Sequence, residues 1–256
     1  MKNRILALLL VLVMVACMFV ACGDDPAPTP DNSDPTPDGS DENGALTHEQ
    51  FLAAEVGSTC TIEAYVQAWQ GWWNNQITLY LQDRDGGYFV YNASCTQENA
   101  NKLTKGCKIR VTGEKTDYNG MIEIYGTDGA ATFEFVEGGD TFIATATDVT
   151  SLYNNTQELV AHQNEFVAVK GLTVQSVSFK NAETAEEASD DIYIVVKLGD
   201  NNHDLCIEVY LTGTSTDVYG VAKTLAAGDV IDIEGFLYWY NNADNIHVTG
   251  ITKVAQ

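Results

Sequence analysis

Two stretches of this chain, LTKGCKIRVTGEKTDYNGMIEI (residues 103–124) and LAAGDVIDIEGFLYWYNNADNI (residues 225–246), align at a constant offset of 122 positions without a gap. The matched positions are apolar, glycine or turn residues: Leu103 with Leu225, Gly106 with Gly228, Ile109 with Ile231, Val111 with Ile233, Gly113 with Gly235, Tyr118 with Tyr240, Asn119 with Asn241 and Ile124 with Ile246. Agreement at a fixed spacing indicates an internal repeat. The chain of 256 residues therefore contains two copies of one structural unit.

Each copy has the pattern of a small β-rich unit. Ile109 and Val111 alternate with polar residues at period two, and the glycine that follows permits tight curvature or a bulge. The first copy is expected to contain a strand at 61–69, a hairpin at 77–91 with its turn at 85–87, and a short helix at 96–103 with Thr96 as a possible N-cap. The second copy is expected to contain a strand at 166–177, a hairpin at 191–211 and a helix at 216–225.

Five strands with a helix between the third and the fourth is the order of the OB-fold, a small Greek-key barrel. The predicted fold class is mainly β, with two tandem five-stranded OB-fold barrels at 45–137 and 138–256, each with a short helix between strands 3 and 4. The Asp-Gly-Gly turn, Leu-x-x-Gly-x-x-Ile-x-Val-x-Gly (103–113) and Tyr-Asn-Gly (118–120) resemble the OB-fold modules of bacterial secreted proteins. Those modules accompany extracellular nucleases and recur in surface lipoproteins. The resemblance implies a fold and a binding surface, but no catalytic residue.

Three of the four tryptophans lie in one short stretch, WQGWWNNQ (69–76). In an OB barrel the ligand crosses strands 2 and 3 between the loops that join strands 1 to 2 and 4 to 5. This stretch is the first such loop and 116–120 is the second. Aromatic faces stack on bases or sugar rings, and asparagine amides can bond base edges or hydroxyls. The expected ligand-binding residues are Trp72, Trp73, Asn74, Asn75, Tyr80, Tyr118 and Asn119 in the first copy, and Tyr238, Trp239 and Tyr240 in the second.

The tryptophans also have structural interpretations. Trp69 continues the first strand, and a role as a cap on the core is favoured for it. Trp72 and Trp73 are adjacent, so on an extended segment they point in opposite directions, and one can be buried while the other is exposed. A further alternative places the whole stretch in a contact between the two barrels.

No reaction centre is predicted. His48, His162, His203 and His247 have no metal-binding spacing, and motifs for nucleophilic or phosphate chemistry are missing from the sequence. Residues 83–86, Asp-Arg-Asp-Gly, resemble the start of a calcium loop, but the rest of that loop is missing, and a hairpin turn alone accounts for them. We expect a non-enzymatic protein that binds no metal and no cofactor.

The charge balance ranks the possible partners. The chain has 13 Lys and Arg against 36 Asp and Glu, a net charge of −23, so its surface repels phosphates but not neutral sugars. We expect a glycan or a protein as ligand, with nucleic acid less favoured. The alternative is a single-stranded nucleic-acid-binding OB-fold protein of the cell surface, helped by one local cluster of cations: Lys102, Lys105, Lys108, Arg110 and Lys115.

Residues 1–21 have the pattern of a lipoprotein signal peptide. Lys2 and Arg4 precede an apolar run that is short for a membrane span. The end of this run, Val20-Ala21-Cys22, resembles the lipobox of bacterial lipoproteins. The resemblance implies a lipid on Cys22 and an anchored position on the extracellular face of a bacterial membrane. Cys17 is a competing lipidation site, and cleavage of an ordinary signal peptide near Ala21 is the other alternative.

Residues 22–44 are expected to form a disordered tether. This segment holds all five prolines and seven acidic residues but no aromatic residue, so it cannot build a core. Four cysteines remain in the folded region and allow three disulfide pairings, although free buried thiols are favoured. These cysteines are Cys60, Cys95, Cys107 and Cys206.

Overall fold

The computed structural model describes residues 44–255. The predicted signal peptide, the lipidation sites Cys17 and Cys22, and the tether up to residue 43 lie outside the described residues. The first half contains α1 (His48–Ala53), β1 (Thr59–Trp69), β2 (Gln76–Gln82), β3 (Gly87–Ser94), α2 (Gln97–Ala100), β4 (Lys108–Tyr118), β5 (Met121–Tyr125), η1 (Thr127–Gly129) and β6 (Thr132–Phe135). The second contains β7 (Thr147–Asp148), α3 (Thr156–Leu159), η2 (Val160–His162), β8 (Phe166–Phe179), β9 (Ile192–Leu198), β10 (Asn201–Ile207), α4 (Val209–Thr212), α5 (Asp217–Lys223), β11 (Val230–Tyr240) and β12 (Ala243–Lys253).

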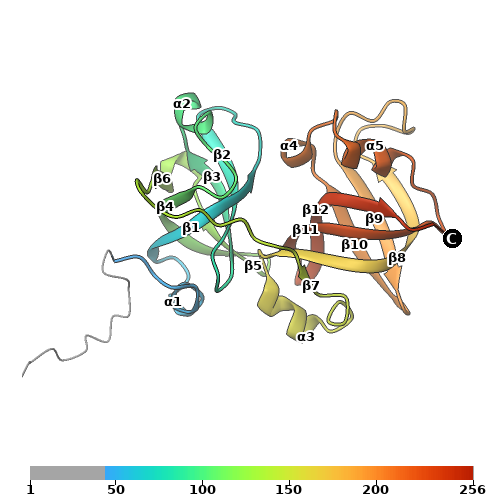
Figure 1. Ribbon diagram of the computed structural model, residues 1–256, viewed down its shortest axis with the longest axis horizontal. Helices are drawn as coiled ribbons and strands as arrows, with labels where there is room; N and C mark the ends of the chain where they lie inside the picture. Colours follow the sequence, from blue (N-terminus) through green and yellow to red (C-terminus); the bar gives the residue numbers. More distant parts are fainter. Residues whose placement is uncertain (1–43, 256) are drawn as a thin grey trace, which may run out of the picture. The chain divides into compact units, whose positions relative to one another are not determined.

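Strands β1 to β5 close into the first barrel, drawn from blue to green in Figure 1. Antiparallel pairs join β1 to β2, β2 to β3, β4 to β5 and β1 to β4, while β3 runs parallel to β5. The ring order is therefore β1-β2-β3-β5-β4, returning to β1, which is the order of an OB-fold. Strand β6 lies alongside β4 outside this ring of five.

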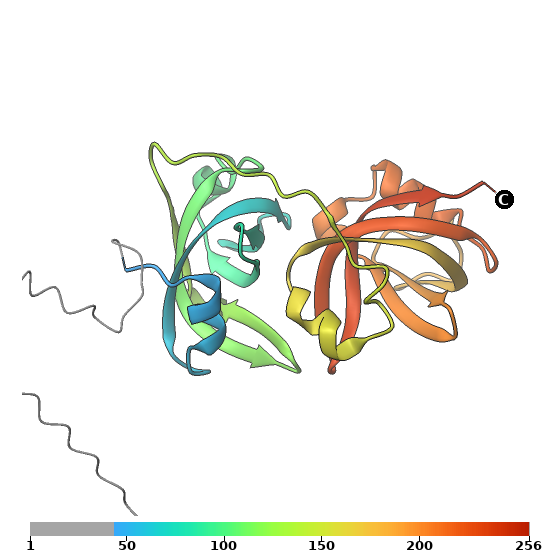
Figure 2. The same cartoon turned by 60° about the horizontal axis from the view of Figure 1, so that its bottom comes forward.

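The second barrel repeats this topology with β8 to β12. Its ring order is β8-β9-β10-β12-β11, returning to β8, and its third and fifth strands, β10 and β12, are again parallel. The predicted fold class, two tandem OB-fold barrels, is confirmed. Residues 136–146, which contain the predicted boundary, have neither helix nor strand and form the olive cord of Figure 2.

The boundaries of two predicted elements differ from the structure. The helix expected at 96–103 is the single turn α2, and Thr96 is its N-cap, with its hydroxyl accepting the Asn99 amide at 3.2 Å. The second hairpin, expected to reach residue 211, ends at Ile207, because Val209 to Thr212 form the helical turn α4. Gly213 ends this turn with φ of 73°, a conformation that suits glycine.

Each barrel has its own core, but one face of the first barrel belongs to the core of the second. Ile77, Leu79 and Leu81 of β2 face the first core, as the alternation predicts. Tyr80, on the opposite face of β2, is grouped instead with the core of the second barrel, as are Phe89 of β3 and Met121 of β5. Both barrels lie within one compact unit.

The described residues include no helix that is both long and apolar enough to cross a membrane. The four cysteines of this region are free thiols, with Cys60, Cys95 and Cys206 buried and Cys107 half-buried. The favoured expectation of free thiols therefore agrees with the structure.

Candidate functional site

Three hairpin turns have the same local sequence pattern, an aromatic residue followed by two residues in the left-handed region. Asn74 and Asn75 have φ of 50° and 60°, and the backbones of Trp73 and Gln76 on either side exchange hydrogen bonds of 3.1 and 2.9 Å. The turn after Tyr118 uses Asn119 and Gly120, and the turn after Tyr240 uses Asn241 and Asn242, also at positive φ. Asparagine tolerates this conformation well, and two such residues form the tight hairpin turn that matches strand twist. These asparagines therefore have a structural role, and their predicted ligand contacts are not needed to explain them.

The three tryptophans of 69–76 have three different environments. Trp69 packs against the first core, as favoured from the sequence. Trp72 also packs there, and its indole Nε1 donates to the carbonyl of Cys95 at 2.8 Å. Trp73 is 70% exposed. An exposed indole ring gives the fold little of the stabilisation that burial of a tryptophan provides. Trp73 is thus the member of the stretch that is free to meet a ligand.

The start of this loop is hydrogen-bonded to the second barrel. The amide of Gly71 donates to the carbonyl of Tyr210 at 2.8 Å, and Gln70 Nε2 donates to Glu208 Oε2 at 2.5 Å. The alternative of a contact between the barrels therefore holds for Gln70 and Gly71, whereas Trp73 is exposed rather than buried between the barrels.

Tyr80 does not face solvent, which corrects the expectation drawn from strand alternation. It is 2% exposed, its ring lies 4.6 Å from that of Phe236, and its hydroxyl is hydrogen-bonded to His247 Nδ1 at 2.7 Å. Burial raises the pKa of this phenol further above its usual range. The outer face of β2 and β3, where OB barrels hold ligands, is partly covered by β11 and β12 of the second barrel.

The residues of the predicted site in the second copy lie on opposite faces of β11, because successive side chains of a strand alternate. Trp239, predicted as a ligand-binding residue, is 3% exposed and belongs to the core of the second barrel, so its ring is not available to a ligand. Tyr238, on the opposite face of β11, stacks on His247 with ring centroids 4.3 Å apart. Tyr118 and Tyr240, the repeat-equivalent residues of the two hairpins, lie with ring centroids 6.2 Å apart. The structure therefore does not gather all the predicted aromatics on one platform.

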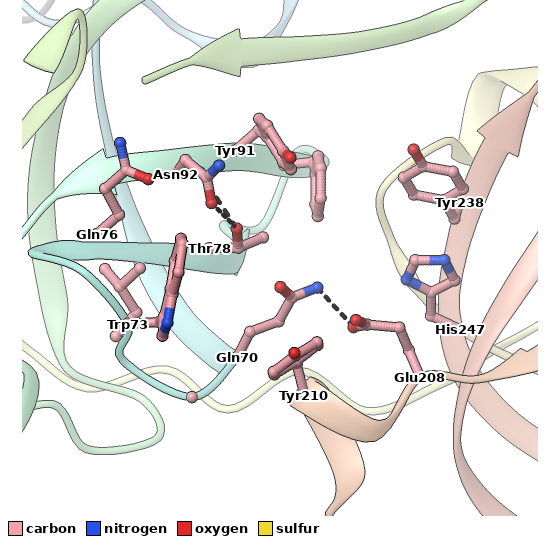
Figure 3. A pocket seen from close by; sticks show the side chains of 13 residues that line it. Gln70, Trp73, Gln76, Thr78, Tyr91, Asn92, Glu208, Tyr210, Tyr238 and His247 are labelled. Carbon is pink, nitrogen blue, oxygen red and sulfur yellow. Dashed lines mark hydrogen bonds between the residues drawn. The ribbon is translucent and has the colours of Figure 1, made fainter. Parts of the chain in front are cut away.

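A pocket of about 450 Å³ opens beside the covered face, with one wall from each barrel (Figure 3). Of the ten predicted ligand-binding residues, Trp73 and Tyr238 line it. Three further aromatic residues, Phe89, Tyr91 and Tyr210, also contribute to its walls. Its polar lining comes from Gln70, Gln76, Thr78, Asn92, Glu208 and His247. Concave sites with aromatic walls and a few polar groups are typical of small-molecule recognition.

Three titratable groups of this interbarrel pocket have shifted pKa values: Glu208, His247 and Tyr238, whose phenol pKa is raised by burial. Burial, followed by the nearby Asp191 carboxylate, raises the pKa of Glu208 to about 7. Burial lowers the pKa of His247 to about 4, so its imidazole is neutral at neutral pH. Lys180 lies near Glu208, but it pairs with Asp190 and Asp191 at 3.3 and 2.9 Å. The lining residues include neither Lys nor Arg.

Most of this pocket could not be predicted from the sequence, because its two walls come from segments that are far apart in the chain, residues 70–92 and residues 208–247. Tyr91 could have been found, since it shares the outward parity of Phe89 on β3 and is 40% exposed. Glu208 and Tyr210 had no such signal, because they were assigned to a strand of the other copy. Only the packing of the two barrels brings α4 beside the loop at 70–73.

Three cations of the predicted cluster, Lys108, Arg110 and Lys115, are engaged with groups of the first barrel. Lys108 and Arg110 both pair with Glu63, at 2.7 and 2.6 Å. Lys115 is 3% exposed, and its Nζ donates to two carbonyls at the C-terminal end of α1, those of Leu52 and Ala54. These three cations thus have their partners within the first barrel, and none of them lines the interbarrel pocket.

Within residues 44–255, no group of three or more His, Cys, Asp or Glu side chains could hold a metal ion. The acidic stretch at 83–86 forms the β2–β3 turn. One carboxylate oxygen of Asp83 accepts the amides of Asp85 and Gly86, at 2.8 and 2.9 Å, and the other accepts the Tyr88 hydroxyl at 2.8 Å. The hairpin interpretation of this stretch therefore accounts for its geometry.

No protein-family model and no curated protein matches the chain. Solved structures that are similar include the p204 HINb domain, at 10% identity over 78% of this chain and 100% of that chain, with a TM-score of 0.35. The Ifi202 HINa domain in complex with 20bp dsDNA is 11% identical over 77% and 98% of the two chains, with a TM-score of 0.33. A Replication Protein A heterotrimer bound to ssDNA is 12% identical over 76% and 48%, with a TM-score of 0.32. The likeness is one of fold alone.

These comparisons correct the predicted ranking of partners. The net charge of −23 favours a glycan or a protein over nucleic acid as the partner. Several of the similar structures are of proteins bound to double- or single-stranded DNA, which runs against that ranking. Net charge describes the whole surface, whereas binding depends on the groups that line one site.

Proposed function

We propose that this chain is a non-enzymatic OB-fold binding protein that binds single-stranded nucleic acid and holds a base in the interbarrel pocket. The observation that carries the proposal is the exposed Trp73, which lies on the rim of a pocket whose other walls include Tyr91 and Tyr210. Stacking of a base on an aromatic side chain contributes about 1–3 kcal/mol, whatever the base. Gln76, Thr78 and Asn92 supply hydrogen-bonding groups on the same side.

The proposal favours the bases rather than the phosphates as the groups that are recognised. Phosphate binding requires cations, and the pocket lining has none. Unpaired bases can be recognised by stacking and by hydrogen bonds to their edges, as occurs in single-stranded recognition generally. A duplex keeps its bases stacked inside, so it offers this pocket much less.

The test is fluorescence anisotropy of a labelled single-stranded oligonucleotide with the full chain and three variants. Trp73→Ala and Tyr210→Ala each remove one exposed aromatic wall and are expected to weaken binding about 10- to 100-fold, in line with the loss of one stacking contact. Tyr118→Ala removes a tyrosine that is 52% exposed but does not line the pocket, and it should bind like the wild type. Circular dichroism checks that each variant is folded.

Absence of binding to any oligonucleotide would overturn the proposal. A neutral polysaccharide titrated in parallel then provides the opposing result. If it binds and Trp73→Ala abolishes that binding, the same pocket belongs to a sugar-binding protein.

We further propose that the chain is lipidated on Cys22 and held at the extracellular face of a bacterial membrane. The support is the sequence pattern Val20-Ala21-Cys22 after an apolar run, followed by the acidic, proline-rich stretch. A single acyl chain anchors a protein only marginally, so stable anchoring requires more than one chain. Labelled palmitate should enter the wild type and Cys17→Ala but not Cys22→Ala. Label retained in Cys22→Ala and lost in Cys17→Ala would assign the lipid to Cys17 instead.

A further inference from the structure

We propose that the interbarrel pocket selects guanine, because the carboxylate of Glu208 accepts the two adjacent N–H groups of the guanine Watson–Crick edge. This inference rests on the proposed binding of single strands. It adds a base preference that stacking alone does not provide, since aromatic faces accept every base.

The carboxylate of Glu208 has unused accepting capacity at the pocket. Its residue is the N-cap of α4, but its side chain makes no capping hydrogen bond there. Within the part of the chain that the structure describes, the side-chain hydrogen bond found for this carboxylate comes from Gln70 Nε2, at 2.5 Å (Figure 3). An ionised carboxylate accepts about four hydrogen bonds, so room for further donors remains.

The charged groups around Glu208 do not supply its carboxylate with further hydrogen-bond donors. Asp190 and Asp191 carry the same sign of charge, and Lys180 is already paired with both. His247, another lining residue, is neutral at neutral pH because its pKa is lowered to about 4 by burial. An ionised Glu208 in this half-buried position is therefore short of donors, and a ligand with two N–H groups side by side would supply them.

The bases differ in what they offer such a carboxylate. Guanine presents N1–H and an N2 amino group as neighbours, which suits both carboxylate oxygens. Adenine and cytosine present one amino group next to a ring nitrogen lone pair, which the carboxylate repels. Thymine presents one N–H between two carbonyl oxygens. A site built to accept hydrogen bonds discriminates strongly against ligands that lack the donors.

The experiment compares four oligonucleotides at a mildly alkaline pH, at which Glu208 is ionised. Three are oligothymidine strands with one central guanine, hypoxanthine or adenine, and the fourth contains thymine alone. Hypoxanthine lacks only the 2-amino group of guanine. The wild type should bind the guanine strand about tenfold or more tightly than the adenine strand, with hypoxanthine between them. Glu208→Gln should bring the four affinities within about twofold of one another. Glu183→Gln, which makes the same change of charge at an exposed site, should keep the preference.

The outcomes separate this inference from the proposed function. Equal binding of all four strands by the wild type would overturn the guanine preference and leave single-strand binding in place. A preference that survives in Glu208→Gln would also overturn the inference, since another group would then read the base. Absence of binding to every strand would overturn both.

Discussion

At the scale of single residues, Glu123 on β5 is a buried carboxyl group that is weakly hydrogen-bonded. It is 4% exposed, and its hydrogen-bond donor is the Thr116 hydroxyl, at a long 3.4 Å. Burial raises the pKa of Glu123 from 4.5 to about 7, with the Thr116 hydrogen bond opposing this rise. The folded protein therefore holds the proton more tightly than the unfolded chain. The contribution to stability is full below the unfolded pKa of 4.5 and is lost as the pH rises through about 7.

Glu123→Gln should remove this loss. We expect the free energy of unfolding of the variant, relative to the wild type, to increase by about 1–3 kcal/mol between roughly pH 4 and pH 8, because one pKa unit corresponds to about 1.4 kcal/mol. Urea unfolding of the variant and the wild type at several pH values measures this difference. Glu208 titrates in both proteins, so its contribution cancels in the comparison. Glu137→Gln, at an exposed position, should give a difference that is independent of pH. A flat profile for Glu123→Gln would contradict the expectation.

At the scale of elements, the repeated glycine of the fourth strand explains why both barrels close in the same way. A Cβ on Gly113 would lie 2.5 Å from Ile124 Cγ2, and a Cβ on Gly235 would lie 2.7 Å from Cγ2 of the repeat-equivalent Ile246. The glycine thus lets the fifth strand cross close to the fourth in each copy. The offset of the sequence repeat is reproduced as a contact between the same pair of positions.

Alanine at Gly113 or Gly235 should destabilise the protein by about 2 kcal/mol or more, because the new methyl group overpacks a filled core. Gly220, within helix α5, has no atom within 4 Å of such a Cβ. Gly220→Ala is therefore expected to stabilise by about 0.5–1 kcal/mol through helix propensity. Chemical denaturation of the three variants tests the contrast in sign. Equal effects at all three positions would refute the role of the close strand crossing.

At the scale of the whole molecule, the charge of −23 and a pocket without cations predict an unusual salt response. A protein that neutralises several phosphates loses about 10³-fold or more in affinity between 50 and 200 mM salt. Here the added salt mainly screens the repulsion between an acidic protein and the strand. We expect the affinity for a single strand to change by less than about threefold over this range, or to increase. A steep loss measured by anisotropy would place the contact on the phosphates and away from the interbarrel pocket.

Local patterning in the sequence was sufficient for each barrel. Strand alternation placed Ile77, Leu79 and Leu81 in the core, and the offset of 122 carried the topology of one copy to the other. Both signals are short-range or periodic, and such signals survive in the one-dimensional sequence because each strand buries one face. The same reasoning predicted that one of Trp72 and Trp73 is buried while the other is exposed, without saying which.

The packing of one barrel on the other decided the site, and no local pattern encodes it. Alternation correctly turned Tyr80 away from the first core, but it could not show that Phe236 and His247 would cover it. Glu208 meets Gln70 across 138 positions of chain, and the pairing depends on where two finished surfaces fit. A residue's exposure is set by everything that packs on its face, so the binding pocket emerged only from the tertiary structure.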